Sequence, residues 1–256
     1  MALKDLTLFG DVDKVGVAVK RLKTFEPKDG YWVGISGGKD STVIYDLVKR
    51  SGVKAEFHHS MTTIDPPEVM RFMREYMPDV EIIRPGQSLF KRMLKEGIPP
   101  LRYRRWCCRE YKEHGGDGRV IVTGVRSEES VKRKGRRMVE KCYNKPNTSF
   151  LHVIIDWTEI EVWEYIKKRE LPYCSLYDEG QKRIGCLFCP NNRNVEQQKK
   201  RWPKMYKAWR KAIYRLYYQQ REKGKLQGYD NPEAYFQWWL SGDRSSVDPN
   251  QLTIFE

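Results

Sequence analysis

The chain has no run of apolar residues long enough to cross a membrane, because no stretch approaches the roughly 20 residues that a span requires. Its first residues, MALKDLTLFGDVDK, do not place a charged segment before an apolar core, as a signal peptide would. We therefore expect a cytoplasmic protein without a membrane partner. Internal repeats and low-complexity segments are also absent, and 256 residues suffice for one α/β domain with a smaller appendage.

The chain has fewer acidic than basic residues. Lysine and arginine number 48 against 34 acidic residues, which gives a net charge of +14 and a pI near 9.4. This excess favours polyanionic partners, although nucleotide phosphates alone would account for part of it and a solvated basic surface is the ordinary alternative. The basic residues concentrate at 102–105, 132–137 and 199–210, so a nucleic-acid partner, either DNA or tRNA, is one expectation.

One stretch, Tyr31–Arg50, organises the chain. The apolar run Tyr31–Ile35 predicts a buried strand, Ser36–Ser41 predicts a glycine-containing turn, and an amphipathic helix is expected to follow. A strand that turns sharply into a helix presents unpaired N–H groups and the positive end of the helix dipole, which suit phosphate. A Walker A loop is excluded, because Val33 stands where that motif needs glycine and Asp40 stands where it needs serine or threonine.

The hexapeptide SGGKDS resembles the PP-loop of the N-type ATP pyrophosphatases, which hold the pyrophosphate end of ATP and adenylylate a substrate. The resemblance implies that ATP and Mg²⁺ are cofactors and that Lys39 and Asp40 are catalytic. Asp40 is a candidate for placing the metal, and capping the helix is its alternative role. The loop residues expected to bind the nucleotide are Ser36, Gly37, Gly38, Lys39, Asp40, Ser41 and Thr42.

Strand and helix patterns alternate through the first two thirds of the chain, which predicts a doubly wound, mostly parallel α/β sheet. Besides Tyr31–Ile35, the expected strands are Ala55–His59, Glu81–Ile83, Arg119–Thr123 and His152–Ile155. Expected helices follow at Pro66–Met77, at Leu89–Lys95 with Ser88 as its cap, and at Thr158–Arg169. Thr62, Thr63 and Asp65 follow a strand, where nucleotide-binding sheets place ligand contacts.

Three parts of the chain differ in composition and in the structure expected of them. Residues 1–27 are expected to form a leading helix, residues 28–190 the nucleotide-binding domain, and residues 191–256 a C-terminal helical extension. In the extension, Val195–Lys225 predicts one long helix, and Tyr235–Leu240 adds an aromatic segment. Aromatic rings among basic residues can stack on nucleic acid, but docking of a helix onto its domain is the more frequent reason for them.

The six cysteines include two pairs, and in a reducing compartment such a set indicates metal or redox chemistry more than disulfides. Cys107 and Cys108 are adjacent, and Cys186 and Cys189 form a CxxC. From the residues alone, zinc, an iron–sulfur cluster and a dithiol all remain open. Cys142 and Cys174 lie outside the pairs, and each is either a persulfide carrier or a small buried side chain.

Together with the loop upstream, the CC…CxxC pattern resembles that of bacterial-type adenylylsulfate reductases, which implies that the two pairs hold a [4Fe–4S] cluster. The segments GVRSEES and LYDEG further resemble the phosphoadenosine phosphosulfate (PAPS) reductase superfamily over residues 28–195. The resemblance implies an adenine nucleotide alpha hydrolase-like fold, with Gly124 and Arg126 at the nucleotide and Arg126 as a third catalytic residue. Glu128 and Glu129 are either positioning groups or ordinary solvent-facing charges.

One departure from the family affects the expected reaction. Assimilatory reductases use a cysteine near the C-terminus as the nucleophile, whereas no cysteine follows Cys189 here. The sequence therefore favours an adenylylating ATP pyrophosphatase in sulfur transfer, and it resembles the sulfur-transfer component of DNA phosphorothioation systems. A cysteine desulfurase is a possible sulfur donor. The alternatives are a sulfonucleotide reductase that uses an external thiol and a zinc-containing nucleic-acid-binding module with a degenerate nucleotide site.

Overall fold

The computed structural model of the chain describes residues 3–7, 10–192 and 194–242. Two compact units are present. The first comprises Met1–Ser60, Pro66–Ile83 and His114–Gly185, and the second comprises Met61–Asp65, Arg84–Glu113 and Cys186–Glu256. Within the described ranges, every helix is too short or too polar to span a bilayer.

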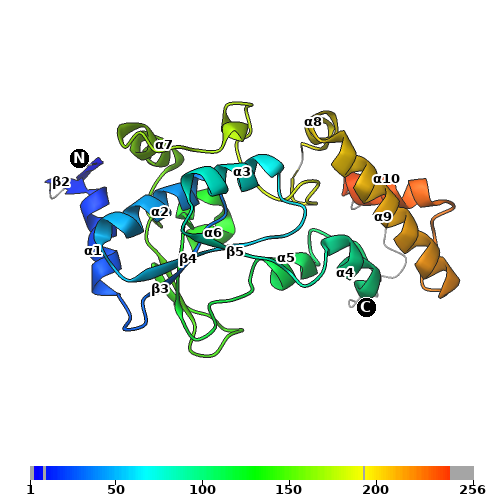
Figure 1. Ribbon diagram of the computed structural model, residues 1–256, viewed down its shortest axis with the longest axis horizontal. Helices are drawn as coiled ribbons and strands as arrows, with labels where there is room; N and C mark the ends of the chain where they lie inside the picture. The colour runs from blue at the N-terminus through cyan, green and yellow to red at the C-terminus, as the bar shows by residue number, and fades with distance from the viewer. Residues whose placement is uncertain (1–2, 8–9, 193, 243–256) are drawn as a thin grey trace. The chain divides into compact units, whose positions relative to one another are not determined.

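A six-stranded sheet forms the centre of the first unit, with the strand order β5-β4-β3-β6-β8-β7. Figure 1 labels β3, β4 and β5 of this sheet. Its first five strands run parallel, whereas β7 pairs antiparallel with β8 at one edge. The strands are β3 (Tyr31–Gly34), β4 (Ala55–Ser60), β5 (Val80–Ile83), β6 (Val120–Thr123), β7 (Val139–Lys141) and β8 (Ser149–His152). The doubly wound, mostly parallel α/β fold expected from the sequence is thus confirmed.

Helices connect the parallel strands. Both β3–α2–β4 and β4–α3–β5 proceed in the same direction along the sheet, so right-handed crossovers place α2 and α3 on the same face (Figure 1). Helix α2 also packs against α1 and α7. The helical elements of this unit are α1 (Lys14–Thr24), α2 (Lys39–Ser51), α3 (Pro67–Tyr76), η1 (Ser127–Glu129), α6 (Val131–Lys134), α7 (Glu159–Lys168) and η2 (Ser175–Tyr177).

The core of the first unit lies between the central strand and α2. Tyr31 and Val33 alternate with half-buried residues along β3, and both are fully buried. Helix α2 buries its apolar side, as its spacing predicts, and none of these four side chains is more than 1% exposed: Val43, Ile44, Leu47 and Val48. This packing fixes the helix against the strand that precedes it, and so fixes the loop between them.

The order of the strands creates a switch point beside β3. From β3 the chain moves outward to β4 and β5, and it then returns to place β6 on the other side of β3. Strands β3 and β6 run parallel with Val33 opposite Val122, so their carboxyl ends lie side by side. Open α/β sheets bind ligands in the crevice outside such a point. The loop after β3 and the segment after β6 meet there.

The second unit is helical. Its elements are α4 (Leu89–Glu96), α5 (Trp106–Tyr111), α8 (Val195–Arg201), α9 (Pro203–Glu222) and α10 (Pro232–Ser241), and α9 contacts α4, α8 and α10 (Figure 1). Trp209 of α9 stacks on Trp239 of α10 with the ring centroids 4.5 Å apart, and Phe90 of α4 meets Trp209 edge-on. Trp209 and Trp239 therefore dock helices, which was the more frequent of the two roles considered for the aromatic rings of the extension.

Three expectations about the elements differ from the structure. The leading helix spans only Lys14–Thr24, because β1 (Lys4–Thr7) and β2 (Gly10–Asp13) precede it as a two-stranded sheet. The strand expected at His152–Ile155 is β8 at Ser149–His152, since its register is set by pairing with β6 and the apolar residues that follow are buried in a turn.

The long helix expected at Val195–Lys225 is two helices. Helix α8 ends at Arg201, and Pro203 opens α9 at its first position. The residue before a proline is pushed out of the helical region, and Trp202 accordingly has a ψ angle of 62°. The aromatic segment Tyr235–Leu240 lies inside helix α10.

Candidate nucleotide site and cysteine group

The loop between β3 and α2 has a shape that requires glycine. Gly37 has a φ angle of +74°, and a Cβ atom added there would lie 2.5 Å from Cγ1 of Val69 in α3. Gly38 is the N-cap of α2, with no side chain to occupy the helix end. The first N–H groups of a helix lack intrahelical partners, so the loop presents donors together with a positive dipole end.

The hydroxyl groups of the loop mostly serve its own conformation. Ser41 and Thr42 are buried, and their hydroxyls donate to the carbonyl oxygen of Gly38 over 2.8 and 3.2 Å. Ser36 is exposed, and its hydroxyl donates to Oγ of Ser41 over 3.1 Å. Ser36 is therefore the hydroxyl best placed to reach a ligand outside the loop.

Lys39 and Asp40 form the charged part of the loop. The Lys39 side chain is only 6% exposed, and its Nζ lies 3.6 Å from Oδ2 of Asp40 and 3.4 Å from Oε1 of Glu159. A buried ammonium group needs such partners, because leaving water unpaired is costly. Asp40 does not cap the helix, since its other oxygen, Oδ1, accepts a hydrogen bond from Nε of Arg126 over 2.6 Å.

Arg126 comes from the segment after β6 and reaches the loop from the neighbouring strand. Its side chain is 3% exposed and pairs with Asp40, and its Nη1 donates to Oε2 of Glu128 over 2.9 Å. Burial alone would lower the pKa of the guanidinium, but the charge and hydrogen bond of Asp40, with Glu129 and Glu128, outweigh it and raise the pKa. The guanidinium stays charged beside the first turn of α2.

Gly124 allows this approach. A Cβ atom added at Gly124 would lie 3.0 Å from the carbonyl carbon and oxygen of Asp40. Any side chain at this position would push the segment after β6 away from α2. The structure thus brings Gly124 and Arg126 together with the loop residues Ser36–Thr42.

Glu128 and Glu129 are not ordinary solvent-facing charges. Besides its pairing with Arg126, the carboxylate of Glu128 accepts the backbone N–H of Glu159 over 2.6 Å and so caps α7. Glu129 accepts the backbone N–H of Arg126 over 3.0 Å and pairs with Arg133. The two carboxylates fix the arginine from both of its ends, which makes them positioning groups.

Tyr177 was not expected at this site. Its hydroxyl accepts the backbone N–H of Lys39 over 2.9 Å, and Nζ of Lys39 lies 5.7 Å from the centre of its ring. Burial raises the pKa of Tyr177, so the hydroxyl stays protonated. The hydroxyl thus occupies one of the donors that a phosphate oxygen would use. The only sequence signal is its place in the segment LYDEG, 138 residues after Lys39.

All four paired cysteines belong to the second unit. Cys107 and Cys108 lie in the first turn of α5, and Cys186 and Cys189 lie in a tight turn in which the Cys189 N–H donates to the Cys186 carbonyl over 3.4 Å. All four thiols are free and only partly exposed. The sequence separates the two pairs by nearly eighty positions, and folding places them in the same compact unit.

Positive charge surrounds these thiols. The Cys107 thiol hydrogen-bonds to Cys108 and Nη2 of Arg105 lies 3.2 Å from the Cys108 sulfur, so the pKa of Cys108 is lowered. Its partner Cys107 has a raised pKa, because of the same hydrogen bond, its burial and the nearby charges of Cys108, Cys189 and Cys186. Burial also raises the pKa of Cys186, and Lys112 opposes that effect.

The four paired cysteines do not have the geometry of a metal site in this structure. Among the described residues, no group of three or more His, Cys, Asp or Glu side chains is close enough together to hold a metal ion. The donor set nevertheless suits a cluster, because four thiols in one unit act on one another electrostatically and two cations balance their charge. Holding one ion or cluster would require the two pairs to draw together.

Residues Thr62–Asp65, expected where nucleotide-binding sheets place ligand contacts, form hydrogen bonds to the cysteine turn. The Leu187 N–H donates to the carbonyl oxygen of Ile64 over 2.9 Å, and the Cys186 thiol lies 3.4 Å from Oγ1 of Thr62. The carboxylate of Asp65 in turn holds Thr62 through its N–H and hydroxyl, over 2.6 and 2.8 Å. Their hydrogen bonds therefore lie within the second unit.

The two remaining cysteines differ from each other. Cys174 is 1% exposed, and burial raises the pKa of its thiol, so it fits the reading as a small buried side chain. Cys142 is half-buried next to the edge strand β7, where its N–H donates to the carbonyl oxygen of Thr148 over 2.8 Å.

Comparison with protein families gives one match. The model of the phosphoadenosine phosphosulfate reductase domain matches residues 30–192, which is more than half of the chain. The matched range contains the loop, Arg126 and all six cysteines. It ends before α8, so α8, α9 and α10 lie outside it.

The individual proteins that match this chain are distant relatives. An uncharacterised protein of Methanocaldococcus jannaschii is 29% identical over 216 residues, and the match covers 80% of this chain but only 50% of that protein. The adenosine 5'-phosphosulfate reductase of Bacillus anthracis is 28% identical over 185 residues, covering 65% of this chain and 79% of the reductase. The chain therefore spans about half the length of the archaeal relative.

A solved structure supports the same fold. The phosphoadenylyl-sulfate reductase of Candida auris, solved as a phosphate complex, superposes with a TM-score of 0.50 at 21% identity. The superposition covers 66% of this chain and 87% of the reductase. At this identity the match speaks for the fold alone.

Proposed function

The chain belongs to the phosphoadenosine phosphosulfate reductase domain family, and from that membership we propose that it is an adenylylating ATP pyrophosphatase acting in sulfur transfer. The observation that carries the proposal is the set of groups at the head of α2. A glycine loop, a buried lysine and a buried arginine from the neighbouring strand meet there. This combination suits a nucleotide polyphosphate.

Binding a polyphosphate would rearrange the charges already present. The ammonium of Lys39 is balanced by Asp40 and Glu159, and the phosphates would replace these carboxylates as its partners. Arg126 already has two carboxylate partners, so it would orient the loop through Asp40 and face the nucleotide with its remaining N–H groups. Charge stabilisation by fixed donors and cations is the main means by which such sites promote phosphoryl and adenylyl chemistry.

Mg²⁺ fits one residue of this site. Asp40 is the side chain that would hold it, because carboxylate oxygens are its preferred ligands and Oδ2 contacts only the nearby ammonium of Lys39. A bound Mg²⁺ supplies charge neutralisation between adjacent phosphates. Cys107, Cys108, Cys186 and Cys189 would hold the [4Fe–4S] cluster, which supplies electron transfer when bound.

The acceptor and the sulfur donor complete the proposal. The net charge of +14 supports a nucleic acid, DNA or tRNA, as the molecule that is adenylylated and then thiolated. DNA phosphorothioation is one reaction of this kind. A cysteine desulfurase would deliver the sulfur, since no described thiol other than the half-buried Cys142 stands outside both the cluster set and the core.

A second candidate is favoured by the names of relatives. Two relatives that cover about two thirds of this chain are adenosine 5'-phosphosulfate reductases, so reduction of a sulfonucleotide by an external thiol would use the same loop for a different nucleotide. Both candidates need the loop, and they differ in the bond that is broken.

Product analysis separates the two candidates. The full-length protein is purified without oxygen and incubated either with ATP, Mg²⁺ and nucleic acid, or with adenosine 5'-phosphosulfate and a thiol. The proposal predicts AMP and pyrophosphate from ATP, and no sulfite from the sulfonucleotide. Sulfite release without pyrophosphate formation would establish the reductase instead. Cleavage of ATP to ADP and orthophosphate would refute the adenylylating reaction.

A further inference from the structure

A cavity in the second unit lies among the C-terminal helices, and no feature discussed above uses it. It has a volume of about 410 Å³ and is lined by the end of α4, the end of α9 and residues of α10. Ligand sites in proteins usually measure about 300–1,000 Å³, so this one suits a single nucleotide-sized group. Its lining residues are Leu94, Lys95, Glu96, Gly97, Ile98, Arg104, Gln220, Lys223, Lys225, Leu226, Tyr235 and Trp238.

The walls of the cavity are held firmly. The side chain of Gln219 in α9 donates to the carbonyl oxygen of Leu94 over 3.1 Å, which ties α9 to the last turn of α4. The indole N–H of Trp239 in α10 donates to the carbonyl oxygen of Pro100 over 2.8 Å. The cavity is therefore a formed feature of this unit.

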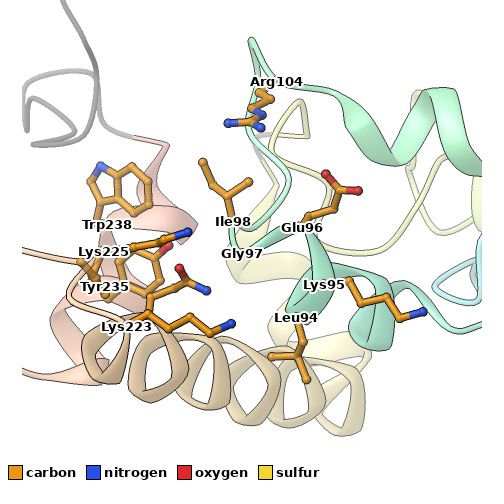
Figure 2. Close-up of a pocket in the computed structure, with 12 residues that line it drawn as sticks. Leu94, Lys95, Glu96, Gly97, Ile98, Arg104, Lys223, Lys225, Tyr235 and Trp238 are labelled. Carbon is orange, nitrogen blue, oxygen red and sulfur yellow. The ribbon is translucent and has the colours of Figure 1, made fainter.

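One wall is a supported aromatic surface. Trp238 is half-buried, and the Tyr235 ring stacks against it with 5.3 Å between centroids and 15° between planes. Tyr229 packs on the same indole at 5.4 Å. In Figure 2 the indole of Trp238 lies on one side of the cavity and the side chain of Ile98 on the other. A flat ring fits between such surfaces.

Cations line the opening, and within the described part of the chain none of them is ion-paired. Lys225 and Arg104 direct their charged ends toward the space between Trp238 and Ile98, Lys223 lines the cavity with its charged end near Leu94, and Lys95 points away (Figure 2). Cations near helix C-termini are common because the dipole favours them, which accounts for Lys223. Arg104 and Lys225 lie outside the helices, so the dipole does not account for them.

A buried amide also faces the cavity. Gln220 is 6% exposed and lines the cavity, and its side-chain amide forms no hydrogen bond to another described residue. An amide offers both a donor and an acceptor. The edge of a nucleobase provides the complementary acceptor and donor.

We propose that this cavity binds one nucleotide of a single-stranded nucleic acid. The base stacks on Trp238 and its edge bonds to Gln220, while Lys223, Lys225 and Arg104 contact the flanking phosphates. Stacking platforms combined with basic residues are how proteins bind single strands. A base in a duplex would first have to be unpaired and unstacked, which costs free energy that a single strand does not pay. The inference deepens the proposed function, because it supplies a binding site for the nucleic-acid acceptor.

The test measures the binding of a short, dye-labelled DNA single strand to the full-length protein by fluorescence anisotropy, without ATP, over a range of salt concentrations. Trp238→Ala is expected to weaken binding about tenfold, since one base–aromatic stack contributes that much. The double variant Lys223→Gln/Lys225→Gln is expected to reduce the slope of log K against log salt by about 1.4, because each phosphate contact on a single strand contributes about 0.7.

The control is Lys200→Gln/Lys204→Gln, which removes the same charge from exposed positions of the same unit outside the cavity. An equal change of slope in the two double variants would overturn the proposal, and the exposed lysine variants keep this readout even if Trp238→Ala does not fold. Unlabelled single strand should compete better than the matching duplex or AMP. Equal competition by AMP would assign the cavity to free nucleotides, and equal competition by duplex would remove the base-binding role.

The binding test is independent of the reaction at the loop. Strand binding with no formation of pyrophosphate would keep the cavity and refute the proposed enzyme. Pyrophosphate formation with strand binding unaffected by the Trp238 and lysine variants would do the reverse.

Discussion

Removing one hydroxyl group should strengthen the binding of phosphate to the loop. The Tyr177 hydroxyl accepts the N–H of Lys39 over 2.9 Å, and it lies 3.3 Å from the position that a Cβ atom would take on Gly38. A phosphate oxygen that binds this N–H has to displace the hydroxyl. Tyr177→Phe removes the competitor and keeps the ring, so the phosphate no longer has to break that hydrogen bond.

The size of the effect follows from one hydrogen bond. An intramolecular hydrogen bond contributes about 1 kcal/mol net, so its loss before binding should tighten the dissociation constant of inorganic pyrophosphate about fivefold. The ligand-free variant should be less stable by a similar amount, which lowers the melting temperature of a protein of this size by about 2–4 °C. Opposite signs for stability and affinity are the characteristic result.

Calorimetric titration with pyrophosphate measures the affinity, and thermal unfolding measures the stability. Tyr173→Phe is the matched control, because its ring also packs edge-on against Trp163 while its hydroxyl donates to the exposed Asp178, away from the loop. The control should leave the affinity unchanged. Weaker binding in Tyr177→Phe would refute the reasoning, because it would mean that the hydroxyl contacts the ligand.

The other substitutions test the shape, the charges and the cysteines of the two units. Gly37→Ala should lower the free energy of unfolding by about 2 kcal/mol, because of its positive φ and the contact with Val69, and an unchanged denaturant midpoint would contradict this. Arg126→Leu should lower the free energy of unfolding by about 2 kcal/mol, less than breaking a fully buried pair does, because the carboxylate of Asp40 stays partly exposed. Adding Asp40→Asn should recover part of that loss. Simple additivity of the two substitutions in a double-mutant cycle would speak against their coupling. Cys108→Ser should remove most of the iron measured after anaerobic purification, whereas full iron retention, or zinc in place of iron in the unmodified protein, would contradict the cluster.

Local sequence patterns predicted the positions of some strands and helices better than those of others. Strand β3 was placed within one residue, because an apolar run marks it. Helix α2 begins at Lys39, inside the turn expected at Ser36–Ser41, because Gly38 is its N-cap. The predicted bounds of strand β8 were wrong, because the residues from Phe150 to Ile155 are mostly apolar. Only the pairing with β6 decides which of them form the strand. The break at Trp202 was readable from the proline that follows it.

In the candidate site, too, local patterns identify some residues, whereas others depend on contacts between distant parts of the sequence. Lys39, Asp40 and Arg126 were selected as candidates because they lie in recognisable segments, and the structure brings them into contact. The roles of Tyr177 and Glu159 depend on contacts across more than a hundred residues of sequence, which no local pattern encodes. The positions of the four paired cysteines in one unit were implied only by resemblance, and their final geometry depends on what they hold.

Isotope exchange between labelled pyrophosphate and ATP tests the adenylylating reaction most directly, because it requires reversible cleavage between the α and β phosphates. The unmodified protein, supplied with Mg²⁺ and nucleic acid, is expected to exchange label into ATP. Lys39→Ala should abolish the exchange while its circular dichroism stays unchanged, and Lys49→Ala, on an exposed turn of the same helix, should retain it. Conversion of ATP to ADP and orthophosphate with no exchange of label, or exchange that survives in Lys39→Ala, would contradict the proposed function.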